Sequence, residues 1–327
     1  MPLDPGAQRV LDLMRETGRP PMHSLAPAEA RAVFTGSRAV LQPEPAPVAL
    51  VEDLTCPGPA GEIRLRHYRG QGTGTGGTET GGTGAGAALP CLLYLHGGGW
   101  VVGDLDSHDQ PCRALANLTG ASVIAVDYRL APEHPFPAAV EDAAAALRFV
   151  HAEAGRLGID PARIAVGGDS AGGNLAAVLC LMARDGTLPA PGFQLLLYPV
   201  TDLGANTASY GRVTEGYPLT ATTMRWFIDH YVAEPAQRHD WRASPLRAAS
   251  LAGVAPAFVS TAGHDPLADE GIAYARRLDR EGVRVAHLHL ADQMHGYLTM
   301  GRFIPAAALT LRQAAAALRT HWGMDQD

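Results

Sequence analysis

Short apolar runs and longer amphipathic segments alternate along most of this chain. After Pro90, apolar runs of strand length recur at residues 92–95, 123–126, 163–166, 193–197, 258–261 and 283–290. Segments with helical spacing of apolar residues lie between and after these runs, at residues 109–118, 138–157, 171–183, 268–281 and 306–321. Continuous apolar runs are typical of strands that are buried on both faces. The pattern therefore predicts an α/β fold with a mostly parallel central sheet that helices flank.

Three segments fall outside this alternation. Before the sheet, residues 8–17 and 28–33 have the spacing of amphipathic helices. Later in the chain, residues 201–241 contain no clear strand, although residues 219–231 are helical in pattern. Because this last segment interrupts the sheet, we interpret it as an insertion that forms a helical cap together with the N-terminal helices.

This pattern divides the chain into four parts. We expect N-terminal cap helices at 1–45, the first part of the core at 46–200, the cap insertion at 201–241 and the second part of the core at 242–327. Two early strands, at 48–56 and 62–68, belong to the core. The glycine-rich tract 70–88 does not join a strand to a helix, as a phosphate-binding loop would. We expect a flexible surface loop without a function there.

Composition and charge narrow the classes of function. The chain has 327 residues, of which 46% are hydrophobic, so it can bury a sizeable core. Its 33 acidic and 26 basic residues give a net charge of −7, and no basic cluster indicates a nucleic-acid surface. Every basic residue is an arginine, which excludes a lysine nucleophile or a Schiff base.

Cysteine spacing and apolar segments indicate the cellular setting. Cys56, Cys91, Cys112 and Cys180 have no paired spacing, so we expect free thiols instead of a metal site or a catalytic thiol. No metal or cofactor is expected. The N-terminus has no basic stretch followed by an apolar run, and no apolar stretch is long enough to span a membrane. The expected location is therefore the cytoplasm.

A candidate nucleophile lies where an apolar run meets a helical segment. Ser170 stands in Gly168-Asp169-Ser170-Ala171-Gly172, between the run at 163–166 and the helix predicted from Ala171. The two flanking glycines allow a sharp turn from strand to helix. Such a turn exposes the serine oxygen near the N–H groups of the helix start. Ser170 is therefore the predicted nucleophile of an acyl-transfer site.

A second glycine motif supplies candidate oxyanion donors. His96-Gly97-Gly98-Gly99 follows the run at 92–95, and glycines there allow backbone amides to approach a substrate oxygen closely. We predict Gly97 and Gly98 as donors, with the N–H of Ala171 as a third. His96 lies at the end of the strand, so we interpret it as a residue that positions the loop and not as a base.

The base and the acid must follow the serine in the chain order of this arrangement. His295 follows the last predicted strand and lies at the same sheet edge as Ser170. Asp265 directly follows the run at 258–261 and is the predicted acid. Asp269 is a competitor that would lie within the next helix, and Asp202 is a weaker one.

Aromatic residues near the glycine loop and in the cap are candidates for a substrate pocket. We predict substrate contacts for Trp100, Tyr210, Trp226 and Phe227, with Tyr217 and Tyr231 as further candidates. The alternative, that these side chains form the core of the cap itself, is equally open.

The chain resembles the hormone-sensitive-lipase-like family of α/β-hydrolases, in particular its bacterial carboxylesterases. Five motifs in the order of that family carry the resemblance, at residues 96–100, 127–133, 168–173, 265–267 and 294–296. The chain departs from the family at His264, where an aromatic or acidic residue is common, and in the length of its glycine-rich tract.

The resemblance implies an α/β-hydrolase fold with Ser170 as nucleophile, Asp265 as acid and His295 as base. It also implies a serine carboxylesterase that acts on short- to medium-chain esters through an acyl-enzyme. An amidase or lactonase would use the same residues. A small-molecule receptor is the alternative outside catalysis, although the receptor branch lacks the histidine present here as His295. The expected partners are a small ester and, in a homodimer, a second copy of the chain.

Overall fold

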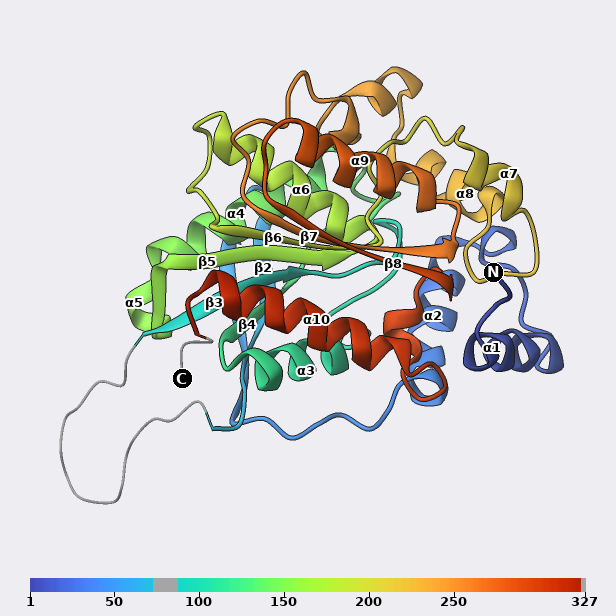
Figure 1. Cartoon of the computed structure of the whole chain (residues 1–327), viewed down its shortest axis with the longest axis horizontal. Helices are drawn as coiled ribbons and strands as arrows, with labels where there is room; N and C mark the ends of the chain where they lie inside the picture. Colours follow the sequence, from blue (N-terminus) through green and yellow to red (C-terminus); the bar gives the residue numbers. More distant parts are fainter. Residues whose placement is uncertain (73–87, 325–327) are drawn as a thin grey trace.

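Eight strands form one sheet at the centre of the molecule (Figure 1). The structure is a computed structural model that describes residues 1–72 and 88–324. The strands are β1 (Leu50–Gly58), β2 (Gly61–Arg69), β3 (Leu89–Leu95), β4 (Ser122–Asp127), β5 (Ile159–Asp169), β6 (Phe193–Leu197), β7 (Ala257–His264) and β8 (Val285–Met294).

The strands are arranged in the order β1-β2-β4-β3-β5-β6-β7-β8. β2 is antiparallel to its neighbours β1 and β4, and all other neighbouring strands pair in parallel. The predicted α/β fold with a mostly parallel sheet is confirmed. The carboxyl ends of β3, β5, β7 and β8 therefore meet at one edge, where ligands bind in open α/β sheets.

Helices cover both faces of the sheet and one of its ends (Figure 1). α3 (Asp109–Thr119) and α10 (Ala306–His321) lie on one face, and α4 (Ala138–Ala152), α5 (Ala154–Leu157), α6 (Ala171–Arg184) and α9 (Ala268–Arg280) lie on the other. α1 (Pro5–Glu16), α2 (Pro27–Leu41), α7 (Ala208–Arg212) and α8 (Ala221–Tyr231) gather at the end toward which β7 and β8 point. Short 3₁₀ turns complete the described structure, at Met22–Ser24, Pro235–His239, Pro245–Arg247 and Tyr297–Met300.

The sheet separates two hydrophobic cores, one beneath each helical layer. The strands of the middle of the sheet supply alternate side chains to the two cores, so Leu93 and Val166 face one layer while Leu92 and Ala165 face the other. Burial on both faces explains why these strands are continuous apolar runs in the sequence.

Several elements differ in extent from the sequence prediction. α2 runs from Pro27 to Leu41, well past the predicted end at residue 33, and within this extension the Thr35 hydroxyl donates to Asp104. β5 continues to Asp169, beyond the predicted end at residue 166, because it pairs with β3 and β6. The predicted helix at 138–157 is divided at Glu153 into α4 and α5.

Three further points concern other parts of the chain. The expectation of a flexible loop at 70–88 falls on residues 73–87, which lie outside the described residues. The four cysteines are free and buried. In the parts of the chain that the structure describes, no helix is both long and apolar enough to cross a membrane.

Candidate active site

Ser170 stands at a sharp turn between β5 and α6. Its φ of 54° and ψ of −115° lie outside the regions that a serine ordinarily adopts. A Cβ at Gly168 or Gly172 would lie 2.1 or 1.8 Å from the carbonyl oxygen of Leu95. The turn therefore packs so closely against the end of β3 that both positions require glycine, in agreement with the sequence prediction.

The structure brings Ser170, His295 and Asp265 together in one chain of hydrogen bonds. Nε2 of His295 lies 2.9 Å from Oγ of Ser170, and Nδ1 of His295 lies 2.7 Å from Oδ2 of Asp265. Since the carboxylate accepts from Nδ1–H, the lone pair of Nε2 is available to the serine hydroxyl. The arrangement can remove the serine proton as the oxygen attacks a carbonyl carbon.

Packing holds the imidazole and the carboxylate in this orientation. The ring of Tyr198 meets the ring of His295 edge-on, with 4.8 Å between centroids. Asp265 is fully buried, and its second oxygen accepts the backbone N–H of Leu267 at 2.8 Å. The histidine can therefore turn little away from Ser170.

The competing acids have other partners. Asp269 accepts the backbone N–H of Ser209 at 2.7 Å and pairs with Arg212 at 3.0 Å. Asp202 pairs with Arg247 at 2.7 Å. The structure thus places Asp265 against the histidine, and it places Asp269 in α9 as the sequence indicated.

In the glycine loop after β3, the N–H groups of the predicted donors differ in their surroundings. The backbone N–H of Gly97 donates to Oδ1 of Asp169 at 3.0 Å, so it is not directed at a substrate. Gly98 and Gly99 line the cavity above Ser170. The predicted donor Gly97 thus already has a partner in this structure, whereas Gly99, which the sequence did not single out, lines the cavity. Three consecutive glycines offer no signal that would distinguish their N–H directions.

His96 holds the loop, as predicted. Its Nδ1 donates to the carbonyl oxygen of Gly97 at 2.8 Å, and its ring stacks on Tyr128 with 4.2 Å between centroids. The hydroxyl of Tyr128 in turn donates to the carbonyl of His96 at 2.7 Å. Burial, reinforced by the nearby His108, lowers the pKa of His96, which favours its neutral form.

A buried carboxylate beneath the loop was not predicted. Asp169 accepts from the hydroxyl of Tyr94 at 2.8 Å and lies 3.2 Å from Nε2 of His108. Burial alone would raise the pKa of Asp169, but His108 and the hydrogen bonds from His108 and Tyr94 hold it below its usual value. Nothing in the sequence pattern indicated these partners, because they come from three separate elements.

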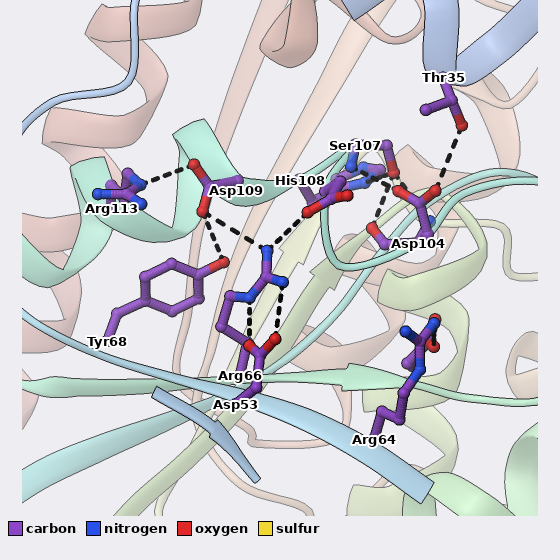
Figure 2. Close-up of polar contacts among 12 residues, drawn as sticks. Thr35, Asp53, Arg64, Arg66, Tyr68, Asp104, Ser107, His108, Asp109 and Arg113 are labelled. Atoms are coloured by element: carbon purple, nitrogen blue, oxygen red, sulfur yellow. Dashed lines mark hydrogen bonds and ion pairs between the residues drawn. The ribbon is translucent and has the colours of Figure 1, made fainter. Parts of the chain in front are cut away.

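Further polar contacts fix the segment that carries His108 (Figure 2). Oγ of Ser107 lies 2.9 Å from Nδ1 of His108 and also accepts the backbone N–H of Asp104 at 2.9 Å. The Thr35 hydroxyl donates to Asp104 at 3.3 Å, which joins helix α2 to this loop. Helix α2 is thereby joined to the loop that carries His108.

A cavity of about 760 Å³ opens above Ser170. Three separate parts of the chain line it, and most of its exposed lining surface is apolar. The N-terminal segment contributes Leu11, Met14, Met22 and Phe34, the segment between β6 and β7 contributes Tyr217, Leu219, Met224 and Phe227, and the loops that follow the strands contribute Gly98, Gly99, Ser170, His295 and Met300. Nδ1 of His23 lies 2.9 Å from the Thr223 hydroxyl, which joins the first two parts.

The predicted aromatic contacts divide between the cavity and the core. Phe227 lines the cavity. Trp100 is fully buried and stacks on Tyr231 with 4.1 Å between centroids, and Tyr210 is also buried. Trp226 contacts Phe227 edge-on and is not among the described residues that line the cavity. Only one face of α8 meets the cavity, so the consecutive residues Trp226 and Phe227 differ in whether they line it.

Comparisons with known proteins agree with this geometry. The family model described as alpha/beta hydrolase fold matches residues 92–299. The carboxylic ester hydrolase LipN of Mycobacterium tuberculosis (strain ATCC 25618 / H37Rv) is 45% identical over 295 residues, which cover 87% of this chain and 74% of that protein. The ethyl acetate hydrolase of Pseudomonas putida is 41% identical over 328 residues, which cover 98% of this chain and 100% of that protein.

A solved structure extends the similarity to nearly the whole chain. The ester-hydrolase EH1AB1 from the metagenome of Lake Arreo is 42% identical and superposes with a TM-score of 0.91. The match covers 98% of this chain and 99% of that one. The sheet order, the serine turn and these relatives lead to one conclusion. The chain belongs to the α/β-hydrolase fold family, within its hormone-sensitive-lipase-like group of carboxylic ester hydrolases.

Proposed function

We propose that Ser170, His295 and Asp265 are the catalytic residues of this ester hydrolase. The observation that carries the proposal is the continuous hydrogen-bond chain from Asp265 through His295 to Ser170. As Oγ of Ser170 attacks the ester carbonyl carbon, its proton passes to Nε2 of His295. Asp265 stabilises the resulting imidazolium and keeps Nδ1 protonated.

We infer that the tetrahedral oxyanion is bound by the N–H groups of Gly98, Gly99 and Ala171. Both glycines line the cavity beside Ser170, and Ala171 begins α6, where N–H groups have no partner within the helix. Preorganised donors of this kind contribute about 2.7–4 kcal/mol each to transition-state stabilisation.

The reaction then proceeds in two halves. Protonated His295 donates its proton to the leaving alcohol as the bond from carbon to the alcohol oxygen breaks, which leaves an ester of Ser170. Water attacks this acyl-enzyme while Nε2 of His295 accepts a proton from the water. His295 then donates that proton to Oγ of Ser170 as the bond to the acyl carbon breaks and the carboxylic acid is released. Every proton transfer uses a group that this chain supplies.

We propose short- to medium-chain carboxylic esters as substrates. The cavity of about 760 Å³ has mostly apolar walls, which suits an acyl or alcohol chain. One relative is named an ethyl acetate hydrolase, which is consistent with a small ester. Amides and lactones would meet the same three residues and are the alternative substrates.

The test is hydrolysis of p-nitrophenyl esters from acetate to decanoate by the wild type and by Ser170→Ala. We expect the wild type to favour the shorter acyl chains and the variant to lose activity by about 10⁴-fold or more. Equal inactivity of both proteins on every ester would instead favour a binding protein on a hydrolase scaffold.

We also propose a homodimer formed through β8. This strand ends the sheet, and its His287 and His289 side chains are exposed. An edge strand can pair with its copy in a second molecule. Light scattering during size-exclusion chromatography measures the mass directly, and a mass of one chain at micromolar concentration would contradict this proposal.

A further inference from the structure

One arginine on the wall of the catalytic cavity has a side chain without a polar partner in the part of the chain that the structure describes. Arg19 lines the cavity that contains Ser170, and its side chain is half-buried. Among the described residues, its guanidinium makes no hydrogen bond and no ion pair. The other described arginine side chains without such a partner are all exposed to solvent: Arg225, Arg276, Arg280, Arg284 and Arg312.

The backbone holds Arg19 in a fixed place. α1 ends in a turn where Gly18 has a φ of 60°, its N–H donates to Arg15, and the N–H of Arg19 donates to Met14 at 3.2 Å. This pair of bonds is the Schellman motif, in which an apolar residue commonly follows the glycine. Here an arginine takes that position, and Pro20 restricts the chain directly after it.

The charged residues that line the cavity near the end of α1 and in the loop before α8 do not form an ion pair with Arg19 in the described structure. Arg15, which also lines the cavity, is already paired with Asp12 at 2.5 Å. Glu215 lines the cavity too, but it is exposed and forms no ion pair with Arg19 within the described structure. Burial lowers the pKa of Arg19, which reflects the cost of holding this cation partly away from water.

We propose that Arg19 binds a carboxylate on the ester substrate, at a point other than the bond that is cleaved. The inference rests on the proposed esterase function and specifies its substrate class. A guanidinium matches a carboxylate with two parallel, charge-assisted hydrogen bonds, and the Arg19 side chain makes no such bond within the described structure. Apolar side chains that line the same cavity, including Met14 and Leu219, suit the hydrocarbon chain between the carboxylate and the ester.

The test compares matched esters with and without a carboxylate. For the acyl side, the pair is mono-p-nitrophenyl adipate and p-nitrophenyl hexanoate, which have the same number of acyl carbons. For the alcohol side, the pair is 6-acetoxyhexanoate and hexyl acetate. In at least one pair, we expect Arg19→Gln to lower the kcat/KM ratio of the carboxylate ester to the neutral ester about tenfold, through KM.

Three further variants make the result specific. Arg19→Lys should keep a large part of the ratio, because the charge remains, whereas Arg19→Glu should lower it further. Arg225→Gln removes an unpartnered arginine on α8 that is exposed to solvent, and it should leave the ratio unchanged. An unchanged ratio in both pairs for Arg19→Gln would overturn the proposal for Arg19. If the wild type hydrolysed neither the neutral nor the carboxylate esters, the proposed esterase function would fail instead.

Discussion

The carboxylate of Asp169 accepts the backbone N–H of Gly97 at 3.0 Å, and this bond joins the glycine loop to the residue before Ser170. The donors of the proposed oxyanion hole and the nucleophile are thereby held in one rigid unit. Tyr94 donates to the same carboxylate oxygen, and Nε2 of His108 lies 3.2 Å from it. A group that never touches substrate can therefore control how well the loop is placed.

We expect Asp169→Ala to lower kcat about 10- to 100-fold, because the loop loses the acceptor that anchors Gly97. KM for a short ester should change much less. Asp169→Asn keeps an oxygen acceptor of the same size and should recover a large part of the loss. Steady-state kinetics of both variants measures this difference, and equal kcat values in the two variants would contradict a positioning role.

The assignment of the acid can be tested with two neighbouring carboxylates. Asp265→Asn should lower kcat by about 10⁴-fold, because an amide favours the wrong tautomer of His295. Asp269→Asn should stay within a few-fold of the wild type, since Asp269 contacts Ser209 and Arg212 instead. The reverse order of activities would overturn the assignment.

The serine turn should tolerate no side chain at Gly172. A Cβ there would lie 1.8 Å from the carbonyl oxygen of Leu95, so Gly172→Ala must displace β3 or α6. We expect a loss of stability of about 3 kcal/mol and almost complete loss of activity. Gly155→Ala, in α5 with open space around it, is the matched control and should leave the melting temperature nearly unchanged. Similar melting temperatures for both variants would contradict the prediction.

Tyr217 lines the cavity, and a hydrogen bond to strand β7 holds its side chain in position. Its hydroxyl lies 2.9 Å from Nδ1 of His264, the residue directly before Asp265. Tyr217→Phe removes this bond and loosens the cap loop, so kcat/KM for octanoate relative to acetate should rise about two- to fivefold. His264→Leu should give the same change, and the double variant should add little. Additive effects would show that the two residues act separately.

A buried acid near the site makes stability depend on pH. Burial raises the pKa of Glu270 well above 4.5, and the charges of Asp202 and Asp265 act in the same direction, against hydrogen bonds from Thr201 and Asp202. The folded protein therefore binds this proton more tightly than the unfolded chain does. Stability conferred by the protonated acid is present below about pH 4.5 and is lost as the pH rises toward the folded pKa.

Glu270→Gln tests this dependence, because the amide oxygen can still accept the N–H groups of Thr201 and Asp202. Relative to the wild type, the variant should gain about 1 kcal/mol or more at neutral pH, with the gain shrinking toward pH 4. Thermal unfolding across this range measures the difference. A constant difference between the two proteins at every pH would show that Glu270 does not carry the effect.

The sequence by itself determined the fold class and the three residues at the centre of the site. Continuous apolar runs indicate parallel strands that are buried on both faces of the sheet, and the carboxyl ends of such strands meet at one edge. Ser170, Asp265 and His295 each follow a strand, so their meeting could be predicted from order alone. The glycines around Ser170 were also readable, because a strand-to-helix turn of this kind requires them.

Only the tertiary structure decided which groups face the cavity. The direction of each N–H in Gly97-Gly98-Gly99 depends on backbone angles and on Asp169, which local sequence does not encode. The burial of Trp100 and the exposure of Phe227 to the cavity depend on how α8 packs. The sequence could not indicate that Arg19 lines the cavity of Ser170 without an ion-pair partner among the described residues. This depends on how the N-terminal segment packs against the rest of the chain.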